Sequence, residues 1–163
     1  MRKYFLLIVA AAVVFSIPQA SFSEIKKGSI EIEPFISYYM LRKTDTGGKG
    51  IRLGYNFTER WGIEATYETV NKPADFIRGD VVYHFSPEKS FVPFVFAGAG
   101  RIRGNTIREE FYVAPFVEVG AGFKWFIMEN IAFRLDGSDL QERHNDIIFG
   151  AGLTLSFGGG SSK

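Results

Sequence analysis

Three residues near the carboxyl end of the chain have the side-chain types that acyl-transfer chemistry uses. Ser138 follows Asp136 and Gly137, and Glu142 and His144 come shortly after it. A serine hydroxyl, an imidazole and a carboxylate form the nucleophile, base and orienting group of many hydrolases. A serine beside a glycine at the end of a strand is, however, also ordinary turn chemistry. We therefore expect no catalytic residue here and keep acyl hydrolysis as an alternative.

Metal and cofactor chemistry has little support in the sequence. Only two histidines are present, His84 and His144, and the chain has no cysteine. The histidines lie far apart, without a His-x-x-x-His motif or a carboxylate clamp, so we expect no metal site and no cofactor. Without cysteine there is no disulfide and no thiolate nucleophile. The 19 Lys and Arg residues balance 18 Asp and Glu residues, which argues against a nucleic-acid-binding protein.

Most of the remaining charged residues alternate with apolar ones. Between Trp61 and Glu68, for example, every second residue is apolar and the residues between them are small, polar or acidic. Charges that share the inner face of a closed structure must be paired and hydrogen-bonded. We interpret them as a salt-bridge network that fills a narrow lumen, with a gated ion path as the alternative. The expected members are Glu31, Glu33, Arg52, Glu64, Glu68, Arg78, Asp80, His84, Glu118, Lys124, Arg134 and Asp136.

The elements that must position these charges are β-strands, because the alternation has a period of two almost everywhere. Candidate strands cover residues 29–41, 50–58, 61–70, 76–85, 91–103, 112–127, 131–137 and 147–157. The inward parity of 91–103 stays open, since both faces of its middle are apolar or small. Tight connectors at 57–61, 86–90 and 128–130 alternate with longer, more polar ones at 42–49, 71–75, 104–110 and 139–145. The pattern predicts an all-β, eight-stranded, antiparallel up-and-down transmembrane β-barrel.

The polar faces are expected to line the interior of this barrel. The apolar faces carry more large side chains than an eight-stranded barrel can hold inside. The polar faces carry glycines, among them Gly54, Gly62, Gly120 and Gly122, which suit the crowded side. In the seven strands of clear parity the apolar face has no charged residue, as expected of a surface that contacts lipid. These observations disfavour a secreted soluble barrel with an apolar interior.

Residues 1–23 are interpreted as a cleavable secretory signal peptide. Arg2 and Lys3 precede an apolar run, Pro18 ends it, and Ser21 and Ser23 are the small residues before cleavage after Ser23. The run is shorter than the roughly 20 residues of a transmembrane helix. Loss of Arg2 and Lys3 changes the formal charge from +1 to −1. The expected domains are the signal peptide at 1–23, the barrel at 24–157 and a short flexible tail at 158–163.

Four runs carry a family resemblance: residues 93–100 (PFVFAGAG), 120–126 (GAGFKWF), 130–136 (NIAFRLD), and the ending 143–145 (RHN) with 152–158 (GLTLSFG). They resemble the outer-membrane β-barrel domain family, small eight-stranded barrels similar to the N-terminal barrel of outer-membrane protein A. The likeness covers nearly the whole mature chain and implies a place in the outer membrane of a Gram-negative bacterium. Each run is a barrel pattern, so the likeness indicates fold and location better than activity.

The last candidate strand also resembles the signal that the barrel-assembly machinery binds. In the family the final aromatic usually ends the chain, whereas here residues 158–163 follow it. Some small outer-membrane barrels modify lipid A, and such a deacylase resembles a His-x-Ser-Asn motif that Asp136-Gly137-Ser138 does not reproduce. The expected assembly-signal residues are Phe149, Leu153, Leu155 and Phe157.

Basic residues gather at the end of the barrel with the longer connectors. Lys and Arg pair well with phosphate, so we expect them to contact lipopolysaccharide as a basic rim. The expected function is a non-catalytic, monomeric envelope protein with a structural or surface-interaction role. The alternatives are a lipid A-modifying enzyme and a narrow ion-conducting pore. The rim residues are Arg42, Lys43, Arg101, Arg103 and Arg108.

Overall fold

A computed structural model describes residues 25–40, 46–71, 74–105, 111–141 and 145–160. Within them the chain forms eight strands joined in sequence order. Their bounds are β1 Lys27–Met40, β2 Thr46–Asn56, β3 Trp61–Val70, β4 Ala74–His84, β5 Phe91–Asn105, β6 Phe111–Met128, β7 Ile131–Gln141 and β8 Asn145–Gly160. The expected signal peptide at 1–23 lies outside the described residues.

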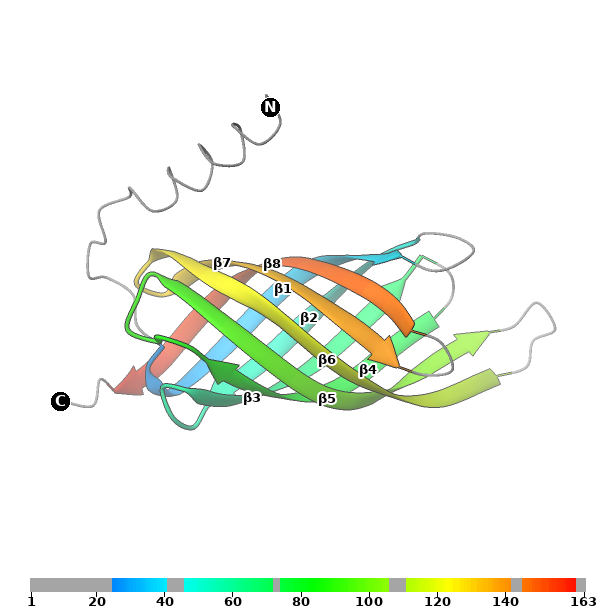
Figure 1. The fold of residues 1–163 in the computed structure, drawn as a ribbon, viewed down its shortest axis with the longest axis horizontal. Coiled ribbons are helices and arrows are strands. Elements are labelled where there is room, and N and C mark those ends of the chain that lie inside the picture. Colours follow the sequence, from blue (N-terminus) through cyan, green and yellow to red (C-terminus); the bar gives the residue numbers. More distant parts are fainter. Residues whose placement is uncertain (1–24, 41–45, 72–73, 106–110, 142–144, 161–163) are drawn as a thin grey trace, which may run out of the picture.

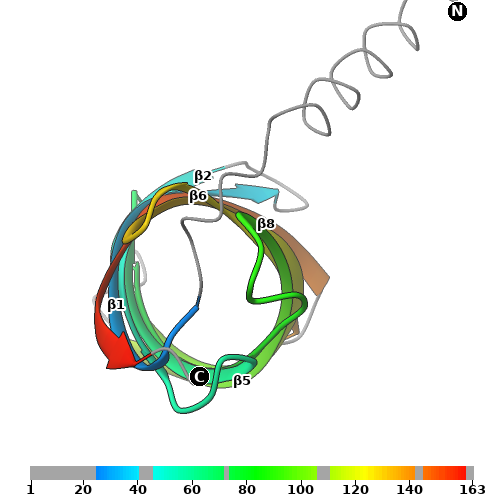
Figure 2. The same ribbon diagram turned by 90° about the vertical axis from the view of Figure 1, so that its left-hand side faces the viewer.

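The strands close into a single antiparallel barrel. Each strand pairs with its neighbours in the chain, and β1 pairs with β8 to complete the ring. The strands tilt relative to the barrel axis (Figure 1), and the end-on view shows the closed ring (Figure 2). The start of β1 and the end of β8 lie at one end, here called the turn end, and the opposite end is called the loop end. The predicted all-β, eight-stranded, up-and-down barrel is confirmed.

Side chains alternate between the inside and the outside of this barrel. In β3, Glu64, Thr66 and Glu68 are buried, whereas Ile63 and Tyr67 are exposed on the outer surface. A strand with this pattern can satisfy its backbone in the ladder while sending successive side chains to opposite faces. The polar faces therefore point inward, and the apolar faces point outward.

The structure also settles the parity of the fifth strand. Val92, Phe94 and Phe96 of β5 point inward and are buried, whereas Phe91 and Val95 are exposed outside. Alternation alone left this strand open, because its apolar residues occupy both faces.

The expected contrast between tight and longer connectors is wrong. At the turn end the strands are joined by residues 57–60, 85–90 and 129–130, and at the loop end by 41–45, 71–73, 106–110 and 142–144. The strands continue into segments that were expected to be loops. Gly48 belongs to β2, where it pairs with Ser37 of β1 and Val70 of β3. A Cβ on Gly48 would lie 2.5 Å from the Glu68 carboxylate and the Ser37 hydroxyl. Glycine at such a position fits a crowded interior as well as a loop.

The predicted end of the barrel at residue 157 is also wrong. Strand β8 continues to Gly160, with Gly158 opposite Ser29 and Gly160 opposite Lys27 of β1. Gly158 and Gly159 have φ values of 69° and 85°, which residues with a Cβ rarely adopt. The glycines that resembled a flexible tail therefore extend the closing strand pair, and residues 161–163 lie outside the described part.

The described residues contain no helix that is long and apolar enough to cross a membrane.

Candidate functional site

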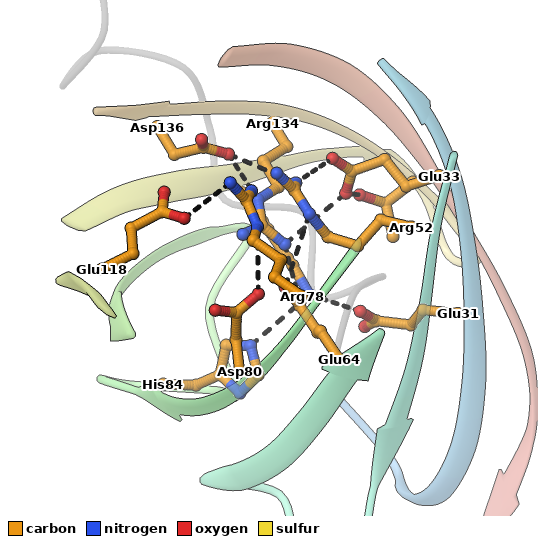
Figure 3. A network of polar contacts seen from close by, with 12 residues as sticks. Glu31, Glu33, Arg52, Glu64, Arg78, Asp80, His84, Glu118, Arg134 and Asp136 are labelled. Atoms are coloured by element: carbon orange, nitrogen blue, oxygen red, sulfur yellow. Dashed lines mark hydrogen bonds and ion pairs between the residues drawn. The ribbon is translucent and has the colours of Figure 1, made fainter. Parts of the chain in front are cut away.

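The candidate site is the barrel lumen, where charged side chains from six strands meet. Strands β1, β2, β3, β4, β6 and β7 each direct acidic or basic groups inward, and Figure 3 shows them converging on one another. The structure places the twelve sequence-predicted residues of this set on the inner side, with side chains removed from solvent. These residues are distant in sequence. They come close because the strand register aligns neighbouring strands and the closed ring is narrow.

Two arginines form the centre of the network. Arg134 donates to Glu64 at 2.7 Å and to Asp136 at 2.8 Å. Arg52 donates to Glu33 at 2.5 Å and to Asp136 at 3.3 Å, and its Nε lies 3.6 Å from Glu64. Each guanidinium therefore faces several carboxylates, the arrangement that a buried arginine needs to offset its lost hydration.

Lys124 lies nearer the turn end and is 0% exposed. Its ammonium group donates a hydrogen bond to Glu31 and lies 3.4 Å from Nε2 of His84. The amide of Asn56 donates to the other Glu31 oxygen at 3.0 Å and to the Ser29 hydroxyl at 3.1 Å. This side of the lumen is thus a connected set of donors and acceptors, with a single lysine as its cation.

A third group lies nearer the loop end. Arg78 donates to Glu118 at 2.7 Å and lies 3.3 Å from Asp80, its neighbour on the same face of β4. The hydroxyl of Ser37 donates to Glu68. Together the three groups spread charge along the lumen instead of concentrating one sign at one level.

Aromatic rings share the lumen with the charges, although the expected lumen network does not include them. The guanidinium carbon of Arg134 lies 4.3 Å from the ring centroid of Phe94, and that of Arg52 lies 4.7 Å from Phe35. Desolvated cations over aromatic faces are attracted by the ring quadrupole. The inward rings therefore contact the network directly and exclude water from it.

Inward rings lie opposite glycines on an adjacent strand, and Phe35 and Phe96 occupy the space that their glycines leave. In the ladders, Phe35 is opposite Gly50, Phe94 is opposite Gly122, and Phe96 is opposite Gly120. A Cβ on Gly50 would lie 2.7 Å from the Phe35 ring, so the two residues fit only as a pair. An inward glycine opposite a phenylalanine in the next strand was the sequence signal for these positions.

Apolar layers close the network at both ends. The loop-end cap consists of Tyr39, Val70, Phe76, Phe116, Leu140 and Ile148. The turn-end cap consists of Ile25, Val92, Phe126 and Ala132. Ile25 precedes β1, and its N–H donates to the carbonyl of Pro87 in the β4–β5 turn at 3.1 Å. The charged layer therefore lies between two apolar caps.

The three residues with acyl-transfer side chains are not brought together within the described structure. Ser138 points into the barrel, where it is 6% exposed, and Glu142 and His144 lie outside the described residues. In the part of the chain that the structure covers, His, Asp and Glu residues form no cluster that could hold a metal ion.

The outer surface carries an apolar belt with aromatic rings near the turn end. Trp61 lies edge-on to Tyr83 with ring centroids 4.8 Å apart, and Tyr83 lies edge-on to Phe85 at 5.0 Å. The four residues of the expected assembly signal point outward from β8. They are Phe149, Leu153, Leu155 and Phe157.

Two residues of the expected basic rim are described. Arg101 and Arg103 lie on the outer face of β5 toward the loop end, and both are exposed. Arg42, Lys43 and Arg108 lie outside the described residues.

An ion pair at the turn end ties the start of the barrel to the β6–β7 turn. Lys26 donates to Glu129 at 2.7 Å. This hydrogen bond and the lysine charge lower the pKa of the Glu129 carboxyl.

Comparison with solved structures places the fold among small membrane barrels. The N-terminal β-barrel domain of Pseudomonas aeruginosa OprF matches with a TM-score of 0.72 and 20% identity over 81% of this chain and 99% of that one. The outer membrane protein OprG of the same organism matches at 0.58 and 13% identity, over 82% and 98%. A de novo designed transmembrane β-barrel matches at 0.56 and 20%, over 82% and 99%. No protein-family model and no curated protein sequence matches the chain.

Proposed function

We propose that this protein is an integral barrel of the bacterial outer membrane with a non-catalytic, structural or surface-interaction role. The observation that carries the proposal is the inverted distribution of its side chains. In β6, Val117 and Val119 are 53% and 52% exposed on the outside, whereas Glu118 between them is 1% exposed inside. Such a surface is stable in hydrocarbon and unfavourable in water, because many adjacent apolar side chains would be hydrated.

The likeness to OprF, OprG and a designed transmembrane barrel supports the same environment. We infer export through a signal peptide cleaved after Ser23, followed by insertion with the help of the barrel-assembly machinery. We expect the outward residues Phe149, Leu153, Leu155 and Phe157 to suit that recognition, because they share the apolar outer face of the closing strand.

A scaffold role fits the lumen better than a conducting one. An eight-stranded barrel is only wide enough to be filled by side chains, and here the charged network and two apolar caps fill it. Acyl transfer is disfavoured by the position of Ser138, whose hydroxyl faces the packed interior instead of the lipid. The loop-end arginines support contact with lipopolysaccharide, since Arg101 and Arg103 are exposed beside the apolar belt.

Electrophoretic mobility before and after boiling tests the proposal. The protein is extracted from outer membranes in detergent, and the unheated sample is expected to migrate differently from the heated one, because the closed barrel survives the detergent. Val119→Arg is expected to lower the yield of the folded form, since an arginine in the middle of the apolar belt costs about 2–4 kcal/mol.

Glu88→Arg is the matched control, because Glu88 is exposed in the β4–β5 turn and not in the belt. It is expected to fold like the wild type. Release of the unmodified protein without detergent, or equal folding of the two arginine variants, would contradict the proposal.

A further inference from the structure

The outer surface has a hollow that the expected function does not explain. It lies over β4 and β5, has a volume of about 420 Å³, and is lined by Ile77, Gly79, Ala99, Arg101 and Arg103. Gly79 and Ala99 are directly opposite each other in the ladder. Small residues at both positions leave space beside larger outward side chains such as that of Ile77. The hollow is thus an apolar floor bounded by two arginines.

The two arginines are placed to bind an anion at one end of this floor. Arg101 and Arg103 are two residues apart on one strand, so their side chains leave the same face about 7 Å apart. Within the described residues neither guanidinium forms an ion pair. Asp75 carries a carboxylate on that face, is opposite Arg103 in the ladder, and accepts a hydrogen bond from Thr69 at 3.1 Å.

Arg101 and Arg103 lie toward the loop end of β5, where the boundary between hydrocarbon and headgroups is expected. Ile77 is paired with Tyr67 on one side and with Arg101 on the other. Tyr67 is exposed outside, and outward tyrosines of membrane barrels collect at that boundary. An arginine at this level can reach phosphate groups while the floor below it contacts acyl chains.

We propose that this hollow binds one phosphorylated glycolipid, with an acyl chain over Gly79 and Ala99 and a phosphate held by Arg101 and Arg103. The proposal rests on the proposed function, because the surface meets lipid only if the barrel is inserted. Guanidinium groups form paired, charge-assisted hydrogen bonds with phosphate oxygens, so the charges of site and ligand are complementary. A second copy of the chain is disfavoured as the occupant, because a two-fold interface centred here would bring the arginines of both copies together.

Native mass spectrometry of the folded barrel in detergent tests the site. The probes are diphosphoryl lipid A, the same lipid without phosphates, and phosphatidylglycerol. The wild type is expected to retain one molecule of the phosphorylated lipid A. Retention should fall about tenfold or more in Arg101→Gln/Arg103→Gln, which removes the phosphate partners. It should also fall in Ala99→Leu, which fills the floor without a change in charge.

Two matched variants serve as controls. Lys49→Gln removes a cation that is exposed on the outer face of β2 at the same end, and Ala121→Leu enlarges an outward alanine on β6 outside the hollow. Both are expected to retain the lipid like the wild type. The heat-dependent gel shift is recorded for every variant, so failure of the barrel to fold is distinguished from failure of the site.

Equal retention by folded wild type and the double glutamine variant would overturn the site. An equal loss in Lys49→Gln would reduce the effect to general charge and overturn it as well. Retention of phosphatidylglycerol or dephosphorylated lipid A as strong as that of diphosphoryl lipid A would overturn the assignment to a phosphorylated glycolipid.

Discussion

At the scale of single residues, the lumen depends on ion pairs between charges that have left water. Lys124 has no solvent contact, and Glu31 accepts its hydrogen bond while Glu64 lies 4.0 Å away. Removing one partner of a buried pair leaves the other charge uncompensated, which costs more than removing both.

The variants Lys124→Met and Lys124→Met/Glu31→Gln test this dependence. Lys124→Met is expected to lower the free energy of unfolding by roughly 3–5 kcal/mol, because the buried Glu31 carboxyl loses its cationic partner. The double variant should be less destabilised than the single one, since it also removes the orphaned charge. Urea unfolding in lipid vesicles, followed by tryptophan fluorescence, measures both values.

Lys27→Met is the control, because Lys27 is exposed and its loss should change stability by less than about 0.5 kcal/mol. A double variant that is less stable than the single one would contradict the interpretation of the network.

At the scale of strands, the fit between neighbours depends on glycine and phenylalanine in register. Gly120 lies under the Phe96 ring, and a Cβ there would be 2.6 Å from a ring carbon and 2.8 Å from the carbonyl of Gly137. Gly79 also lies within a strand but points outward, where the nearest atom to a Cβ would be 3.9 Å away.

The same substitution at the two glycines is therefore expected to have opposite effects. Gly120→Ala should destabilise the barrel by about 1–3 kcal/mol, because the ring or the backbone must move. Gly79→Ala should be neutral or slightly stabilising, since alanine restricts the unfolded chain and meets no obstacle. Unfolding midpoints in urea compare the two, and equal loss of stability would contradict the ring-over-glycine packing.

The sequence predicts the number of strands and the inward side of most of them. It does not predict every inward residue or every strand end. Alternation identifies eight strands and the inward side of seven, because a period of two needs only local information. It does not identify the inward rings of β5, since Phe94 and Phe96 are as apolar as the outward residues beside them. It also shortens β2 and β8, where Gly48 and Gly158 were interpreted as loop and tail. Both errors concern features that depend on how a strand pairs with its neighbour, and the local pattern of one strand does not contain that information.

At the scale of the whole molecule, the two apolar caps oppose the passage of water and ions through the barrel. Water and ions entering from either end would meet buried side chains, such as Phe116 at the loop end and Phe126 at the turn end. In planar lipid bilayers we expect small or absent conductance, because both caps place buried apolar side chains in the path of ions. Stable, large, ion-selective current steps would contradict the scaffold role and favour the pore alternative.

The central claim is that the apolar outer surface contacts lipid, and cysteine labelling in vesicles tests it most directly. The natural chain has no cysteine, so Ile63→Cys, Val119→Cys and Leu153→Cys each introduce a single thiol on the outer surface. Glu88→Cys is the control, because Glu88 is exposed in the β4–β5 turn. With a charged, water-soluble maleimide added to both faces of the membrane, the turn thiol is expected to react rapidly and the three strand thiols to be protected until the barrel is unfolded. Strand thiols that react as fast as the turn thiol in the folded protein would contradict the account.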